Sequence, residues 1–307
     1  MSEKDILSLN DCTLCPRECH ADRTTKYGYC GCDFNIYIAR AAAHMWEEPC
    51  ISGKNGSGAV FFCGCNLRCI FCQNKEISRF NEGFGDRYKS YTKDELCDIF
   101  LRLEDAGLNN INLVTATHYM PQVIAAIGQA KDKGLKIPIV YNSSGYEKKE
   151  AIKRLEGLVD VYLPDFKYIS TDLSKKFSKA PDYGEYAKEA IDEMFRQQSK
   201  LVFSDEALIK KGVIIRHLVL PGHTKESIGV LDYLYEKYKD NVYISIMSQY
   251  TPVSLIPEYK ELNRKLTKRE YEKVLNHALD LGIKNAYIQE GKVAKESFIP
   301  TFDGHII

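Results

Sequence analysis

The chain has 307 residues, of which 44% are hydrophobic and 27% charged, and this composition excludes wholesale disorder. The 42 Lys and Arg residues balance the 42 Asp and Glu residues, so the bulk charge predicts neither nucleic acid nor a membrane surface as a partner. No apolar run is long enough to span a bilayer, and the first residues lack a signal-peptide pattern. We therefore expect a cytoplasmic protein whose thiols are kept reduced.

Residues 1–55 look loop-like and rich in cysteine, and a glycine-rich connector follows them. We expect a small metal-binding segment over 1–55 and a second domain over 56–307. The spacing C-x2-C-x3-C, with a fourth cysteine eleven positions later, offers four thiolates: Cys12, Cys15, Cys19 and Cys30. Four thiolates close a tetrahedral zinc site or ligate a closed iron–sulfur cluster, and the sequence leaves both open. The spacing differs from that of ferredoxins, which favours a structural metal knuckle. Free thiols in a loop are the remaining alternative.

Beyond residue 56, short apolar strands alternate with helices. The predicted strands cover 59–63, 111–115, 137–141, 159–163, 213–220 and 242–247, with a weaker one at 286–289. The predicted helices cover 92–106, 120–133, 147–155, 186–198, 225–239 and 267–281. Six strand–helix units predict an α/β fold that forms a partial (β/α)6 barrel. Polar residues follow nearly every predicted strand, which indicates one active-site mouth at the carboxyl ends of the strands.

The loop after the first of these strands carries the most specific motif. Cys65, Cys69 and Cys72 have the spacing C-x3-C-x2-C, and Phe71 stands just before the last cysteine. A [4Fe–4S] cluster normally takes four thiolates, so three leave one iron open to a small-molecule chelator such as S-adenosylmethionine (SAM). The motif resembles the signature of the radical SAM superfamily, C-x3-C-x-aromatic-C.

Further segments extend the resemblance over nearly the full chain and make it similar to the PflX-type branch, which is related to pyruvate formate-lyase activating enzymes. They are residues 12–30, 47–50, 114–121, 140–147, 160–168, 216–222 and 249–252. The resemblance implies that a [4Fe–4S] cluster reduces SAM, which yields methionine and a 5′-deoxyadenosyl radical that abstracts a substrate hydrogen. It also implies an electron donor such as flavodoxin or ferredoxin. The substrate that it favours is a backbone glycine of a partner protein, on which the enzyme generates a glycyl radical.

The resemblance further implies which residues contact the cofactors. These are Phe71, Asn74, Thr115, Thr117, His118, Asn142, Ser143, Asp165, Lys167, Leu218 and Gln249. Lys167 would hold a carboxylate as a point cation. Two positions depart from the wider family. The segment 115–118 stands where other members carry Gly-Gly-Glu, and Gln249 stands where activating enzymes often carry His.

Several roles stay open at this point. Cys63 fits a core strand residue, or a hydrogen-atom donor that would favour epimerase chemistry on a sugar or a peptide residue. Arg216 and His217 fit substrate-facing or structural roles. The alternatives to an activating enzyme are therefore a radical SAM epimerase or another small-molecule enzyme, and an iron–sulfur or zinc protein without enzymatic activity.

Overall fold

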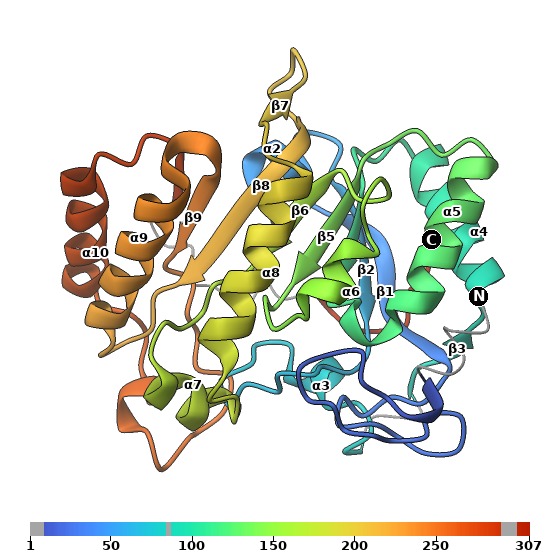
Figure 1. The fold of residues 1–307 in the computed structure, drawn as a ribbon, viewed down its shortest axis with the longest axis horizontal. Helices are drawn as coiled ribbons and strands as arrows, with labels where there is room; N and C mark the ends of the chain where they lie inside the picture. Colours follow the sequence, from blue (N-terminus) through green and yellow to red (C-terminus); the bar gives the residue numbers. More distant parts are fainter. Residues whose placement is uncertain (1–8, 84–86, 290–299) are drawn as a thin grey trace.

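The computed structural model describes residues 9–83, 87–289 and 300–307, and one ten-stranded sheet runs through them (Figure 1). The strands are β1 (Ile36–His44), β2 (Ser57–Phe62), β3 (Ser90–Tyr91), β4 (Ile111–Val114), β5 (Ile139–Ser143), β6 (Val161–Pro164), β7 (Val202–Phe203), β8 (Ile209–Leu218), β9 (Tyr243–Met247) and β10 (Ala286–Ile288). The strand order is β10-β9-β8-β6-β5-β4-β2-β1-β3, and β7 pairs with β8.

Helices follow most of these strands. The α-helices are α2 (Pro49–Ser52), α3 (Lys75–Ser78), α4 (Lys93–Asp105), α5 (Met120–Asp132), α6 (Lys149–Lys153), α7 (Thr171–Ser178), α8 (Tyr183–Gln197), α9 (Thr224–Tyr238) and α10 (Lys268–Leu281). Short 3-10 helices occupy η2 (Thr117–Tyr119), η3 (Lys239–Asn241) and η4 (Lys260–Asn263).

The predicted partial barrel is confirmed. Strands β2, β4, β5, β6, β8, β9 and β10 are all parallel, and they include the six predicted units. Within the described residues, β3 and β10 stand at opposite ends of the strand order, so the sheet stays open. Most of the parallel strands are buried on both faces, which explains why they read as continuous apolar runs in the sequence.

Local signals fix several helix ends where the sequence predicts them. Thr92 caps α4, and the Glu95 side chain accepts a hydrogen bond from the Thr92 backbone N–H in return. At the C-terminus of α10, Gly282 takes the left-handed conformation with φ of 82°. These ends set where each strand–helix unit turns, and therefore where the next strand begins.

The prediction of a loop over 1–55 is wrong for residues 36–44. This segment forms β1, which runs antiparallel to β2, and α2 follows it. The strand was missed because Ala39 and Ala41–Ala43 have weak strand propensity. Pairing with β2 and burial of Ile36 and Ile38 in the core override that preference.

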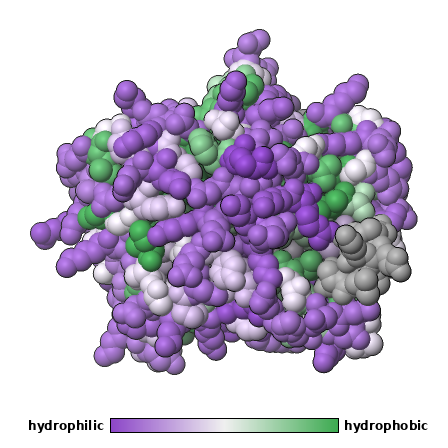
Figure 2. All heavy atoms as spheres, viewed as in Figure 1, coloured by the Kyte–Doolittle hydropathy of each residue, from purple (hydrophilic) through white to green (hydrophobic). Residues whose placement is uncertain are grey.

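The N-terminal segment, residues 9–32, lies beside α3 at the end of the sheet to which the parallel strands point (Figure 1). The opposite end carries α2 and the β7 hairpin. The face drawn in Figure 2 is mostly hydrophilic, with small scattered apolar areas. Among the described residues, no helix combines the length and the apolar character that crossing a membrane requires.

The Thr92→Ala variant tests the capping box of α4. Loss of the cap leaves backbone N–H groups of the first turn without their partner, so we expect the free energy of unfolding to fall by about 1 kcal/mol. Urea unfolding of the metal-free protein measures the change. The exposed Lys136→Ala variant is the control, with an expected change below about 0.5 kcal/mol. Equal effects in the two variants would contradict the role of the cap.

Candidate active site

The loop that carries the three cysteines begins with a backbone turn that only glycine fits. Gly64 follows β2 with φ of 88°, and a Cβ at this position would lie 2.2 Å from Sγ of Cys32 and 2.9 Å from the carbonyl oxygen of Cys30. The turn directs the chain out of the sheet toward the N-terminal segment. The cysteine loop (residues 64–72) therefore starts in direct contact with that segment.

Arg17 fixes the middle of the cysteine loop. Its guanidinium donates to the carbonyl oxygens of Asn66 at 2.8 Å and of Ser178 at 2.8 Å. The backbone N–H of Cys65 donates to the carbonyl oxygen of Cys30 at 3.1 Å, and that of Ile70 donates to Phe177 at 2.8 Å. The N-terminal segment on one side and α7 on the other thus hold the loop in one shape.

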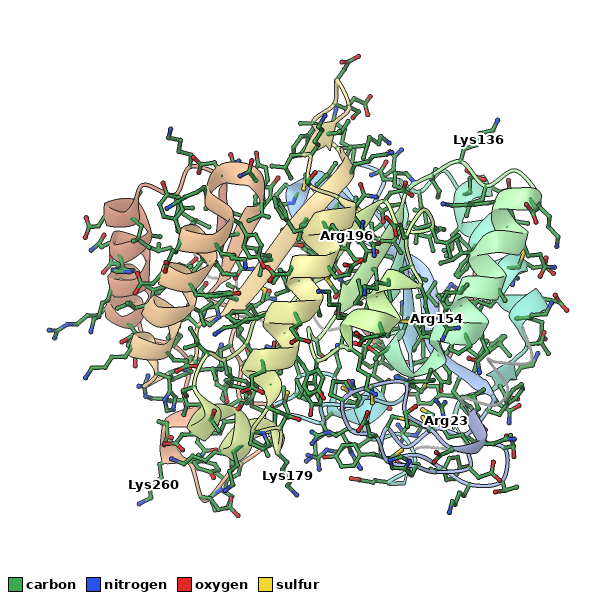
Figure 3. The ribbon with its side chains drawn as sticks, viewed as in Figure 1. Arg23, Lys136, Arg154, Lys179, Arg196 and Lys260 are labelled. Carbon is green, nitrogen blue, oxygen red and sulfur yellow. The ribbon has the colours of Figure 1, made fainter. Side chains whose placement is uncertain are left out.

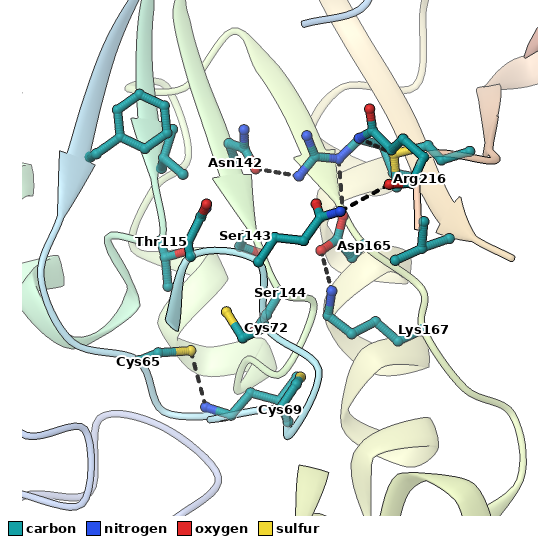
Figure 4. A pocket seen from close by; sticks show the side chains of 18 of the residues that line it. Cys65, Cys69, Cys72, Thr115, Asn142, Ser143, Ser144, Asp165, Lys167 and Arg216 are labelled. Carbon is teal, nitrogen blue, oxygen red and sulfur yellow. Dashed lines mark hydrogen bonds and ion pairs between the residues drawn. The ribbon is translucent and has the colours of Figure 1, made fainter. Parts of the chain in front are cut away.

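The loop and the strand ends enclose one cavity of about 240 Å³ (Figure 4). Thirteen of the residues singled out from the sequence line it: Cys65, Cys69, Phe71, Cys72, Asn74, Thr115, Asn142, Ser143, Asp165, Lys167, Arg216, Leu218 and Gln249. They come from the loop, from Asn74 at the start of α3, and from the carboxyl ends of five parallel strands. The polar residues predicted at separate strand ends therefore meet in one place.

The three thiols of the loop face this cavity. Burial raises the pKa of Cys65, Cys69 and Cys72, and the Lys167 ammonium opposes that shift at each thiol. Ser178 donates to Sγ of Cys69 at 3.0 Å, and the Leu67 N–H donates to Sγ of Cys65 at 3.4 Å.

These residues fit a [4Fe–4S] cluster. Across the described residues, no three His, Cys, Asp or Glu side chains converge as ligands of a single metal ion. Three buried thiols that face one cavity, beside a lysine that favours their thiolate forms, are instead the donor set for a cluster with one open iron.

A charged network crosses the cavity above the loop. Asp165 accepts from Nζ of Lys167 at 2.5 Å and from Nε of Arg216 at 3.0 Å. Burial alone would raise the pKa of Asp165, but the two cations outweigh it and lower the pKa. Arg216 also donates to Oδ1 of Asn142 at 2.6 Å (Figure 4). It pairs with Glu47 at 3.2 Å. Arg216, whose role the sequence left open, therefore lies in the site.

Glu47 is a site residue that strand-end reasoning missed. It lies between β1 and α2, and its Oε1 accepts from Nδ2 of Asn112 at 3.0 Å. Burial raises the pKa of Glu47, and the charge of Arg216 opposes the shift. The acidic pair before Pro49 was the available signal, but the predicted loop gave no reason to place it inside the barrel.

Ser144 was also missed. Its buried Oγ lines the cavity and has no hydrogen-bond partner among the described residues, so it remains available to a ligand. The polar run after β5 was the signal for this residue.

His217 does not line this cavity, and its Nδ1 lies 2.8 Å from the carbonyl oxygen of Phe166. Three further sequence candidates are not among the lining residues. Thr117 Oγ1 donates to Oε1 of the buried Glu147 at 2.6 Å. His118 Nε2 lies 2.7 Å from the carbonyl oxygen of Cys63, and burial lowers the pKa of His118 to about 3. The Cys63 thiol is buried in the core, which raises its pKa. All three contact the framework behind the cavity wall.

Comparisons with known proteins identify a family for this chain. Residues 59–234 match the Radical SAM superfamily. The chain is 32% identical over 270 residues to the uncharacterized protein MJ0674 of Methanocaldococcus jannaschii. The aligned region covers 87% of this chain and 74% of that protein.

Similar solved structures include methylornithine synthase, with 13% identity, a TM-score of 0.46 and coverage of 91% of this chain and 70% of that one. A domain of a pyruvate-formate lyase-activating enzyme from Bacteroides vulgatus has 14% identity, a TM-score of 0.41 and coverage of 56% and 92%. Streptococcus suis SuiB bound to its precursor peptide has 14% identity, a TM-score of 0.49 and coverage of 75%, and the chain spans 47% of SuiB.

Glu147 gives a pH-dependent prediction. Burial raises its pKa from 4.5 to about 7, so between these values the folded chain binds more protons than the unfolded chain. The free energy of unfolding should therefore fall as the pH rises through this window. The Glu147→Gln variant removes the ionisation. Over this range we expect its free energy of unfolding to fall by on the order of 3 kcal/mol less than that of the wild type.

Urea unfolding of the metal-free protein between about pH 5 and pH 7.5 measures this difference. The exposed Glu150→Gln variant on α6 is the matched control and should follow the wild type. Parallel pH curves for Glu147→Gln and the wild type would show that the buried carboxyl does not ionise in this window.

Proposed function

The chain belongs to the radical SAM superfamily, and we propose that it is an activating enzyme that generates a glycyl radical on a partner protein. The observation that carries the proposal is the single cavity shared by three cysteine thiols and polar strand ends. A [4Fe–4S] cluster held by Cys65, Cys69 and Cys72 would supply the electron that cleaves SAM.

The residues of the chain would bind and orient the cofactors in this proposal. Lys167 would meet a carboxylate, while Asn142 and Ser143 offer an amide and a hydroxyl at the end of β5. Phe71 and Leu218 would shield the reaction from water. The Asp165 carboxylate would hold Lys167 in place, because the two form an ion pair at 2.5 Å.

The positions of the cysteines favour a reaction in which no cysteine donates a hydrogen atom back to the substrate radical. All eleven cysteines lie within the described residues, and only Cys65, Cys69 and Cys72 line the cavity. An epimerase that uses a cysteine as its hydrogen donor needs a further thiol there, and Cys63 is buried in the core instead. A glycyl radical needs no such donor, since the radical itself is the product.

The rim of the cavity supports a protein substrate. Trp46 lines the cavity and is 59% exposed, and Met45 beside it is 45% exposed. Exposed aromatic and methionine side chains are enriched at protein–protein interfaces. We propose that the partner's glycine loop enters past these side chains and that a flavodoxin or ferredoxin supplies the electron.

The Cys69→Ala variant tests the radical chemistry. Anaerobically reconstituted wild-type protein with dithionite should convert SAM to 5′-deoxyadenosine, measured by liquid chromatography and mass spectrometry. The variant should lose this activity, because one of the three cluster ligands is removed. The Cys97→Ala variant removes a buried thiol on α4 that does not line the cavity, and it should retain the activity. Normal turnover by Cys69→Ala would refute the site.

The substrate class is tested with a pooled library of glycine-centred peptides that carry deuterium on the glycine Cα. We expect deuterium to appear in 5′-deoxyadenosine and an organic-radical electron paramagnetic resonance (EPR) signal to appear on the peptide. This signal should be a doublet for the undeuterated library and should collapse when Cα carries deuterium. Incorporation of a single solvent deuteron into a peptide or sugar product in D2O would instead establish the epimerase alternative.

A further inference from the structure

Five cysteines lie in the N-terminal segment, outside the cavity, and four of them are the predicted metal ligands Cys12, Cys15, Cys19 and Cys30. The chain reverses over 12–21, since the N–H of Cys12 donates to Ala21 at 3.1 Å and that of His20 donates to Cys12 at 3.1 Å. This reversal packs the Cys19 side chain against the small buried cluster that contains Cys12. The Cys15 and Cys30 thiols are close enough for their charges to interact.

Two of these thiols lie beside Gly28. A Cβ at Gly28 would lie 3.4 Å from Sγ of Cys19 and 3.6 Å from Sγ of Cys30. The Cδ atom of Arg23 lies 3.4 Å from the same point, so the two sulfurs and the Arg23 side chain meet beside Gly28. Cys12, Cys15 and Cys30 are buried, while Cys19 is partly exposed.

A buried cation lies against this group. Arg23 has no solvent exposure and lies among the sulfur atoms of the segment (Figure 3). Its guanidinium donates to the carbonyl oxygens of His118 at 2.6 Å, Asp33 at 2.6 Å and Cys32 at 3.2 Å. In the part of the chain that the structure describes, no carboxylate pairs with it. A buried charge without a counter-charge is costly, and four thiolates around a metal centre would supply a net negative charge there.

One hydrogen bond joins this group to the cysteine loop. The carbonyl oxygen of Cys30 accepts from the N–H of Cys65 at 3.1 Å, so two proposed metal ligands are in direct backbone contact. Sγ of Cys32 also donates to the carbonyl oxygen of Cys63 at 3.2 Å. A redox centre at Cys30 would therefore lie next to the cavity cluster, with Cys19 on its solvent side.

We propose that Cys12, Cys15, Cys19 and Cys30 bind a second iron–sulfur cluster that passes electrons to the cavity cluster through the contact between Cys30 and Cys65. Zinc has no redox chemistry, so only iron–sulfur makes use of this contact. The relay rests on the proposed function, whereas the metal centre itself does not.

The electron balance of the relay is simple. A ferredoxin- or flavodoxin-class donor reduces the second cluster by one electron, and the second cluster is reoxidised as the cavity cluster is reduced. No atom or proton is transferred in this step.

The Cys65→Ala/Cys69→Ala/Cys72→Ala variant isolates the second centre. Anaerobic reconstitution should give about eight irons per wild-type chain and about four in the triple variant. The reduced triple variant should show the EPR signal of one cluster. The Cys50→Ala/Cys97→Ala variant removes two buried thiols outside both groups and should keep about eight irons. One zinc per triple-variant chain, or no metal, would overturn the proposal.

The Cys19→Ser variant tests the relay itself. Reduction of the cavity cluster by flavodoxin and by dithionite is followed by EPR, and we expect the flavodoxin-to-dithionite rate ratio to fall about tenfold. The exposed neighbour His20→Ala should keep the wild-type ratio. An unchanged ratio in Cys19→Ser would overturn the relay. Failure of the wild type to cleave SAM with either reductant would refute the proposed function, while the iron counts would still decide the second centre.

Discussion

The site depends on the hydrogen bonds that the guanidinium of Arg17 donates. The guanidinium joins carbonyl oxygens of the cysteine loop to the end of α7, and so ties the loop that carries the three thiols to the rest of the fold. Each of these charge-assisted hydrogen bonds contributes about 1.5–3 kcal/mol in typical cases. Gly64 is the complementary constraint, because the loop can leave β2 toward Cys32 only where no side chain intervenes. The position of the cavity follows from these two residues.

The charged network of the cavity is the second organising feature. Asp165 stands between Lys167 and Arg216, so each cation is held by a carboxylate before any ligand arrives. Glu47 reaches the same guanidinium from the opposite end of the barrel. Such mutual pairing keeps the side chains in one arrangement and reduces the reorganisation that a bound cofactor would require.

Much of the fold could be predicted from the sequence, because parallel strands and capped helices leave strong local signals such as the Thr92–Glu95 box. The cysteine motif and the polar residues at the strand ends are also patterns of neighbouring residues, which the sequence shows directly. The missed features depend on contacts that are distant in sequence. β1 exists because it pairs with β2, and Glu47 enters the barrel because β1 directs it there. The resemblance placed Thr117 among the cofactor-contacting residues, but it could not reveal that the Thr117 hydroxyl donates to the buried Glu147.

The contacts of Arg17 also bear on the order of events during synthesis. The carbonyl groups of Ser178 and Lys179 lie 161 and 162 positions beyond Arg17 in the sequence. Non-local contacts of this kind form late, because a long loop must close first. The first cysteines leave the ribosome long before α7 does, so the cysteine loop reaches its final shape only after more than half of the chain has been translated. Iron delivery to this loop would therefore be a late maturation step. The cysteines would be most vulnerable to oxidation before that step, while the chain is still nascent.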